Sequence, residues 1–239
     1  CEMLIEKPHD EITRNNYLQM VLNSGKRASD LTKKLLVFAR KGKIESTPVD
    51  LHKIINDAVL LLKRSVDKKV KIEMDFNAQK YFVTGDYTQL MNIFINMGIN
   101  AEHAMPEGGT LIYKTSLVEL NSQYCQKSTF ELNPGTYLLA EIIDNGTGIN
   151  PELISKIFEP FFTTKEKGKG TGLGLSAVYG TVRQHNGEIL VESELAKGTT
   201  FKILLPVIEN VVEEKPENDN YTSGTGVVLV VDDEYIIQV

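Results

Sequence analysis

Glycines alternate with other residues in the segment Gly168-Lys-Gly-Thr-Gly-Leu-Gly-Leu-Ser176. The apolar spacing after it predicts a helix from about Thr171 to His185, so this segment opens the helix. The free N–H groups and the dipole at a helix N-terminus favour phosphate. Lys165, Lys167 and Lys169 add positive charge on a loop without an apolar anchor. A plain flexible loop is the alternative, but it does not explain alternating glycines directly before an apolar helix.

Two other nucleotide-binding patterns fit the chain less well. Gly172-x-Gly174-x-x-Ala177 matches the relaxed dinucleotide fingerprint, and Glu192 follows about 20 residues later. That fingerprint must directly follow a strand, however, and here a polar run rich in lysine and glycine precedes it. The chain contains no Gly-x-x-x-x-Gly-Lys-[Ser/Thr] phosphate loop.

Two asparagines form a second candidate site. Asp86 is expected to cap an amphipathic helix that runs to about Ala104, and Asn96 and Asn100 lie on one face of it. Apolar neighbours bury this face in part, and an unsatisfied buried amide costs about 1–3 kcal/mol. An amide oxygen suits Mg²⁺, with phosphate oxygens completing the coordination. Hydrogen bonds from the helix to a strand are the alternative.

A third motif, Asp144-Asn-Gly-Thr-Gly148, follows the apolar strand expected at 137–144. A carboxylate at a strand end can accept a hydrogen bond from an exocyclic amine. The two glycines would let a flat ring approach the backbone. An Asn-Gly hairpin turn is the alternative.

Apolar periodicity divides residues 46–208 into strands and helices. Alternate apolar positions predict strands, and apolar spacings of three and four predict helices. Strands are expected at 70–76, 81–84, 111–120, 137–144, 188–193 and 199–205, helices at 50–64, 86–104 and about 171–185, and a helix start at Asn150-Pro151. This order predicts an α+β fold, a two-layer α/β sandwich with an antiparallel ending.

Different patterns flank this unit. Residues 12–41 predict one long helix with a narrow apolar seam, and 1–45 read as part of an antiparallel helical hairpin whose first arm is mostly missing. Residues 209–226 have the composition of an acidic linker. Residues 227–239 begin with a buried-type strand that ends in Asp232-Asp233. Both ends look cut, so the chain is expected to be a piece of a longer protein.

Composition excludes several classes of protein. The 239 residues are 41% hydrophobic, enough for one or two domains with a core. Residues 209–239 hold eight acidic residues and one basic residue, a net charge of −7. Because the whole chain has a net charge of −6, residues 1–208 have a net charge of +1. This is no basic nucleic-acid footprint. Two cysteines, Cys1 and Cys125, favour a reducing compartment, and neither a signal peptide nor a membrane-length apolar run is present. We expect a cytoplasmic location, with membrane anchoring of the intact protein left open.

The motifs occur in the order Asn96/Asn100, Asp144-x-Gly-x-Gly148, Phe158-Glu-Pro-Phe-Phe-Thr-Thr-Lys165 and Gly170-Thr-Gly-Leu-Gly-Leu175. This order resembles the N, G1, F and G2 boxes of sensor histidine kinases. Their ATP-binding domain has the Bergerat fold, shared with type II topoisomerase, heat-shock-90 and mismatch-repair ATPases. The resemblance covers roughly residues 11–206. Residues 31–40 look like the second helix of a dimerisation hairpin of the nitrogen-regulatory subclass, and 228–234 resemble the first strand of a receiver domain. The whole therefore looks like a piece of a hybrid kinase.

The resemblance implies a role for each matching residue. Asn100 would bind Mg²⁺, and Asn96 would help to hold metal or phosphate. Asp144 would bind the adenine amine, with Thr199 supporting that end. The positions implied around the ring, in the lid and in the phosphate cradle are Gly146, Gly148, Ile149, Thr164, Lys165, Gly170, Thr171, Gly172, Leu173, Gly174 and Leu175. His103 is implied as a phosphate contact. The pair Glu102-His103 departs from the family pattern, since many relatives have a basic residue just after Asn-Ala. Asp232 and Asp233 resemble a receiver's Mg²⁺ ligands.

The family transfers the ATP γ-phosphoryl group to a histidine on the first hairpin helix. His9 is followed by acidic residues, but it lies after Pro8 in an expected loop, so the acceptor is expected upstream of Cys1. ATPase relatives place a general-base glutamate where this chain has Asn96, which favours transfer to a histidine over hydrolysis. We therefore expect a kinase module that binds ATP and Mg²⁺ but does not phosphorylate itself. Its expected partners are a second copy, through the hairpin, and a receiver domain or response regulator. A non-catalytic nucleotide-binding or dimerisation module and a water-hydrolysing ATPase are the alternatives.

Overall fold

The computed structural model describes residues 15–22, 25, 47–165 and 170–208. Residues 15–22 are helical, as predicted for that part of the long helix. The rest of the predicted hairpin, His9, Lys167, Lys169, the acidic linker and the pair Asp232 and Asp233 lie outside the described residues.

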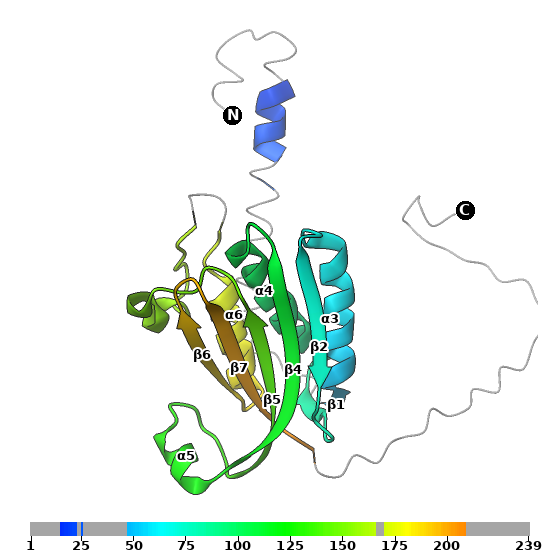
Figure 1. Ribbon diagram of the computed structural model, residues 1–239, viewed down its shortest axis with the longest axis vertical. Coiled ribbons are helices and arrows are strands. Elements are labelled where there is room, and N and C mark those ends of the chain that lie inside the picture. The colour runs from blue at the N-terminus through cyan, green and yellow to red at the C-terminus, as the bar shows by residue number, and fades with distance from the viewer. Residues whose placement is uncertain (1–14, 23–24, 26–46, 166–169, 209–239) are drawn as a thin grey trace, which may run out of the picture. The chain divides into compact units, whose positions relative to one another are not determined.

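A five-stranded sheet organises residues 47–208. Its strand order is β2-β4-β5-β7-β6, from β2 (Val70–Phe76) through β4 (Gly109–Leu120), β5 (Gly135–Asp144) and β7 (Gly198–Pro206) to β6 (Glu188–Glu194). β2 pairs with β4 in parallel, and every other pairing in the sheet is antiparallel. β5 and β7 lie side by side in the sheet (Figure 1), and their register places Asp144 at the end of β5 opposite Thr199 of β7.

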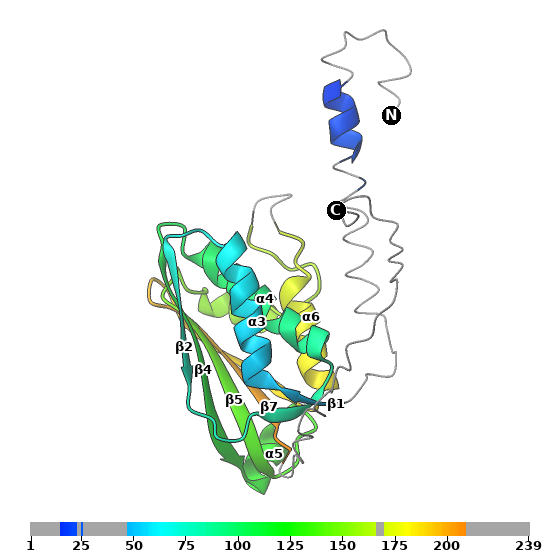
Figure 2. The ribbon, with the colours of Figure 1, turned by 90° about the vertical axis from the view of Figure 1, so that its right-hand side faces the viewer.

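Three helices cover one face of the sheet: α3 (Leu51–Ser65), α4 (Tyr87–Ala104) and α6 (Gly174–Gln184) (Figure 2). Asp50 and Asp86 cap α3 and α4 as predicted, accepting hydrogen bonds from the N–H groups of Lys53 at 2.9 Å and Gln89 at 2.8 Å. Their apolar faces pack into one core against the strands. Burying each large aliphatic side chain there contributes about 1.5–3 kcal/mol. The predicted α+β two-layer architecture is confirmed.

A small second sheet precedes α3. β1 (Thr47–Asp50) pairs in antiparallel fashion with β3 (Phe82–Gly85), so that Thr47 lies opposite Gly85. The sequence predicted a strand at 81–84 but none at 47–50. The four residues of β1 are too few to show a period, and their partner is more than 30 residues away, so a local pattern does not predict the pairing.

The connection between β4 and β5 partly covers the other face of the sheet. It contains the short helix α5 (Ser122–Lys127), which was not predicted. The hydroxyls of Tyr124 and Ser128 donate to the buried carboxylate of Glu188 on β6, at 2.6 and 2.7 Å. Leu120, Tyr137 and Leu204 form a second buried cluster on this face. The connection is therefore held in place by burial and by hydrogen bonds to β6.

Two predicted helix boundaries differ from the structure. α6 begins at Gly174 rather than near Thr171, because the glycines before it form an irregular segment. The helix start at Asn150-Pro151 opens a 3₁₀ helix, η1 (Pro151–Lys156), rather than an α-helix. None of the helices in the described ranges has the length and apolar character needed to cross a bilayer.

Candidate functional site

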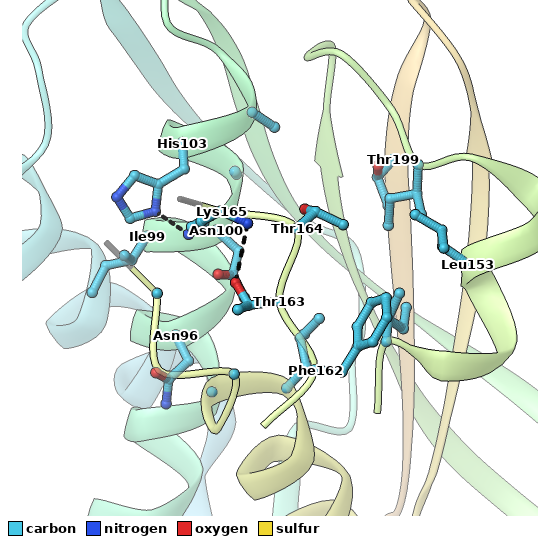
Figure 3. Close-up of a pocket in the computed structure, with 18 of the residues that line it drawn as sticks. Asn96, Ile99, Asn100, His103, Leu153, Phe162, Thr163, Thr164, Lys165 and Thr199 are labelled. Carbon is cyan, nitrogen blue, oxygen red and sulfur yellow. Dashed lines mark hydrogen bonds between the residues drawn. The ribbon is translucent and has the colours of Figure 1, made fainter. Parts of the chain in front are cut away.

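A cavity of about 440 Å³ lies between α4, the segment 162–165, the start of α6 and the ends of β5 and β7 (Figure 3). Its walls come from segments far apart in the sequence. The residues that line it are Asn96, Ile99, Asn100, Ala101, His103, Ala104, Asp144, Thr147, Gly148, Ile149, Leu153, Ile157, Phe162, Thr163, Thr164, Lys165, Gly170, Thr171, Gly172, Gly174, Leu175, Thr199 and Phe201. The fold therefore brings the four sequence motifs around one space.

One end of the cavity is built around Asp144. Its side chain is only 7% exposed, and its Oδ1 accepts hydrogen bonds from the N–H groups of Gly146 at 2.9 Å and Thr199 at 3.3 Å. Burial raises the pKa of this carboxyl, and the two backbone donors oppose the shift. Within the described ranges no group donates to Oδ2. This end therefore offers a ligand the Oδ2 acceptor of a largely buried carboxylate.

The two glycines after Asp144 are needed for backbone packing. A Cβ on Gly146 would lie 2.5 Å from the carbonyl oxygen of Ala104 on α4. Gly148 has φ +69°, and a Cβ there would lie 2.1 Å from the carbonyl oxygen of Glu194. The Asn-Gly hairpin alternative is wrong, since the segment leads from β5 to η1 rather than into a paired strand.

The opposite wall is a face of α4. Figure 3 shows Asn96, Asn100 and His103 along this helix, all three facing the cavity. The Nδ2 group of Asn96 donates to the carbonyl of Asn92 at 2.9 Å, within α4. The alternative of hydrogen bonds to a strand is therefore wrong for Asn96.

Lys165 reaches α4 from the segment 162–165. Its ammonium donates a hydrogen bond to Nδ1 of His103 at 2.7 Å, so the ring is neutral at that nitrogen. Burial lowers the pKa of Lys165, and the nearby carboxylate of Glu102 opposes this. Burial and the positive charge of Lys165 lower the pKa of His103. A cation is thus held at the Asn100 side of the cavity.

The glycine-rich segment is joined to the segment before Lys165. The N–H of Phe161 donates to the carbonyl of Gly172 at 2.9 Å, and both residues have positive φ, +68° and +65°. A Cβ on Gly172 would lie 2.3 Å from the carbonyl carbon of Phe161. Leu173, the N-cap residue of α6, makes no side-chain capping hydrogen bond, so no side chain at the N-cap competes with a ligand for the first N–H groups of this helix.

The structure places most of the predicted site residues in the cavity wall. Gly146 and Leu173 are the exceptions: Gly146 packs on α4, and Leu173 is buried before α6. The sequence analysis missed the apolar wall, chiefly Leu153, Ile157, Phe162 and Phe201. The spacing of Leu153 and Ile157 after Pro151 was an available signal for one side of it.

Comparison with known proteins agrees with this geometry. Residues 85–209 match the family model described as histidine kinase-, DNA gyrase B- and HSP90-like ATPase. The chain belongs to this family. The matched segment covers every residue of the cavity wall. The function class is that of the ATP-binding catalytic domain of two-component sensor kinases.

Two curated relatives are kinases. The chain is 38% identical over 224 residues to sensor kinase CckA of Brucella abortus (strain 2308), covering 90% of this chain and 24% of that protein. It is 30% identical over 200 residues to sporulation kinase E of Bacillus subtilis (strain 168), covering 83% of this chain and 25% of that protein. The chain thus spans about a quarter of the length of these relatives.

Solved structures show the same fold. A mycobacterial sensor histidine kinase, MprB, has a TM-score of 0.54 at 25% identity, with 68% of this chain and 97% of that chain covered. The catalytic domain of histidine kinase ThkA has a TM-score of 0.54 at 26% identity, covering 68% of this chain and 95% of that chain.

Proposed function

We propose that this chain is the catalytic portion of a sensor histidine kinase, which transfers the γ-phosphoryl group of ATP to a histidine outside the chain. The observation that carries the proposal is the cavity described above. Figure 3 shows Thr199, whose N–H donates to Asp144, on one side of it and Asn100 with Lys165 on the other. Asp144 would accept from the adenine amine. Lys165, the glycine-rich segment and the start of α6 would hold the phosphates.

The residues fit a Mg²⁺ ion that binds together with ATP. No cluster of three or more His, Cys, Asp or Glu side chains that could hold a metal exists within the described residues. The side-chain oxygen of Asn100 suits a hard cation without adding negative charge near a triphosphate. We therefore propose that Asn100 supplies one ligand and Asn96 supports the metal or phosphate. Bound Mg²⁺ would neutralise the charge that develops on the transferred phosphoryl group.

Three of the chain's four histidines lie in the described residues, and each has another role there. The ring of His52 stacks between Phe76 and Tyr81, at centroid distances of 4.5 and 4.6 Å. His185 is 4% exposed, and both of its ring nitrogens are hydrogen-bonded. His103 accepts from Lys165. These contacts support an acceptor other than the three described histidines.

Hydrolysis needs a general base near the phosphates. Asp144 is the single carboxylate among the described residues that line the cavity. It lies at the end proposed to bind adenine, and its Oδ1 accepts from two backbone donors. Asn96 cannot take a proton from water. This supports phosphoryl transfer to a protein rather than to water.

The segments on either side supply the proposed partners. We propose that residues 1–45 contribute to a homodimer of the nitrogen-regulatory subclass. We also propose that 227–239 begin a receiver domain, with Asp232 and Asp233 as Mg²⁺ ligands, in a hybrid kinase of the cytoplasm. Similarity to a two-component sensor, PprA of Pseudomonas aeruginosa, at 34% identity over 182 residues supports a receiver or response regulator as partner. A monomeric mass in light scattering would contradict the homodimer.

The proposal is tested with Asp144→Asn. The amide keeps the size of the side chain but loses the carboxylate acceptor, so we expect affinity for ADP with Mg²⁺ to fall about tenfold or more, as charged hydrogen bonds are lost. Calorimetric titration of the parent and the variant measures this. Glu192→Gln, an exposed carboxylate of β6 outside the cavity wall, is the matched control and should bind like the parent.

Incubation with γ-labelled ATP separates the remaining alternatives. We expect neither stable acid-labile label on the chain nor appreciable steady-state phosphate release. Label on His9 would overturn the external acceptor, and phosphate release would favour the ATPase. Equal, negligible nucleotide binding by the parent and Asp144→Asn would favour a non-catalytic module.

A further inference from the structure

Ser193 of β6 joins three segments behind the Asp144 end of the cavity. It is half-buried, and it does not belong to the cavity wall. Its Oγ lies 2.8 Å from the backbone nitrogen of Ile149, 3.0 Å from the carbonyl oxygen of Gly198 and 2.9 Å from Oγ1 of Thr199. Ile149 and Thr199 line the cavity themselves. One hydroxyl therefore connects two parts of the wall.

The chemistry of these partners fixes where the protons lie. A serine hydroxyl has one hydrogen to donate and two lone pairs to accept with. The carbonyl of Gly198 can only accept, so it takes the hydrogen of Ser193. The N–H of Ile149 can only donate, so it fills one lone pair. The contact with Thr199 must then use the second lone pair, with Thr199 as the donor.

This assignment determines what Thr199 can offer to a ligand. Its hydroxyl hydrogen is directed to Ser193, so only its lone pairs remain for the cavity. Asp144, whose Oδ1 accepts from the N–H of Thr199, presents a second acceptor at the same end. A ligand group that meets both must be a donor. An exocyclic amine carries two N–H donors, whereas a ring carbonyl offers none.

We infer that Ser193 is a positioning residue that holds Thr199 as an obligate acceptor, and so makes the site prefer a 6-amino purine over a 6-oxo purine. The inference rests on the proposed function, because it takes the base to lie at the Asp144 end. It adds a residue outside the cavity that controls base selectivity through the direction of one hydroxyl hydrogen.

The experiment compares ADP with inosine diphosphate, which replaces the 6-amino group with an oxygen. In Ser193→Ala the hydroxyl of Thr199 is free to turn and donate to that oxygen. We expect the ratio of ADP affinity to inosine diphosphate affinity to narrow by about fivefold or more, the scale of one polar group gaining or losing its partner. Ser193→Thr keeps the hydroxyl and should restore the parent ratio. Calorimetric or competition titration gives both affinities.

The change in the affinity ratio caused by Ser193→Ala must depend on the hydroxyl of Thr199, and a double-mutant cycle tests this dependence. Thr199→Val removes the acceptor and should itself narrow the ratio. In that background, adding Ser193→Ala should change the ratio by less than about twofold. If Ser193→Ala does not fold, Thr199→Val and Ser193→Thr still carry the test. Ser116→Ala, a half-buried strand serine outside the cavity, should leave the ratio unchanged.

Two outcomes would overturn the inference while the proposed function stands. One is an equal loss of affinity for both nucleotides in Ser193→Ala, as a purely structural role would give. The other is a narrowed ratio that persists when Thr199 is already valine. Failure of the parent to bind ADP would instead overturn the proposed function, and the inference with it.

Discussion

Lys165 is positioned at the Asn100 side of the cavity by a hydrogen bond within the protein. Its ammonium is half-buried and forms no ion pair with any residue that the structure describes, and its hydrogen-bond partner is the neutral ring of His103. A half-buried cation without a direct ion pair is unfavourable, and burial therefore lowers its pKa, although the nearby carboxylate of Glu102 opposes the shift. A phosphate would supply a directly bound negative charge. The residue is therefore suited to bind the phosphates rather than the base.

Lys165→Met tests this at the scale of one residue. The variant keeps an unbranched chain but loses the charge, so affinity for ATP with Mg²⁺ should fall about tenfold or more, as expected for hydrogen bonds to charged groups. Affinity for adenosine, which has no phosphate, should not change. Titration with both ligands measures the difference. Lys156→Met makes the same charge change at an exposed position of η1 and serves as the control. An equal loss for ATP and adenosine would show that Lys165 only maintains the fold.

At the scale of elements, one backbone contact joins the two segments that border the cavity beside α6. Phe161 and Gly172 are hydrogen-bonded and both have positive φ. Phe161 is 61% exposed, so its own burial does little to hold this geometry. The contact with Gly172, together with the packing of Phe162 on the core, therefore helps to hold the segment 162–165 near the start of α6.

Gly172→Ala should disrupt this contact. Positive φ costs a non-glycine residue about 1–2 kcal/mol, and the new Cβ would also press on the backbone of Phe161. We expect a lower melting temperature and weaker ATP binding. Gly174→Ala, two residues later, is the matched control: its Cβ would meet Asn96 Oδ1 at an ordinary 3.5 Å, so the melting temperature should hold. Equal melting temperatures for the two variants would contradict the strain argument.

At the scale of the molecule, the sequence predicts what local patterns determine. α3 and α4 begin where predicted because Asp50 and Asp86 are local caps before periodic apolar runs. β1 and α5 were missed because β1 depends on a distant partner and α5 has no apolar period.

The same distinction applies to the candidate site. Asn100, Asp144 and the glycine-rich segment could be found because each belongs to a contiguous motif. Phe201 and Ser193 could not, because their place at the cavity follows from the pairing of β7 with β5 and β6. The direction of the Thr199 hydroxyl depends on four atoms from three segments, and no sequence pattern encodes it.

The described histidines make the stability of the whole domain depend on pH. Burial lowers the pKa of His52, His103 and His185 below the ordinary 6.5. His185 is the most buried: its Nε2 accepts from the N–H of Asp86 at 3.1 Å, and its Nδ1 donates to the carbonyl of Thr181 at 2.7 Å. Protonation would set two N–H groups against each other. The neutral ring therefore joins the start of α4 to the end of α6.

The sign of the pH effect follows from proton binding. Below pH 6.5 the unfolded chain takes up protons on these histidines before the folded domain does. Their contribution to the free energy of unfolding is therefore fully present above pH 6.5 and is lost as the pH drops through the folded-state pKa values. The raised pKa of Asp144 acts in the opposite sense: its contribution to stability is present below the ordinary pKa of 3.8 and is lost as the pH rises above that value. Because three histidines oppose this single group, acid should destabilise the domain between pH 7.5 and 5.5.

Urea unfolding at these two pH values measures the loss, and His185→Asn assigns it. The variant should be less stable at both values but should lose less stability on acidification, since it no longer titrates. His103→Asn removes a more exposed ring and should change the pH dependence less. Each comparison is the change in the free energy of unfolding of one variant between the two pH values. Any pH-independent loss of stability caused by the substitution therefore cancels. A pH dependence that is the same in His185→Asn as in the parent would show that this ring is not held neutral by the contacts between α4 and α6.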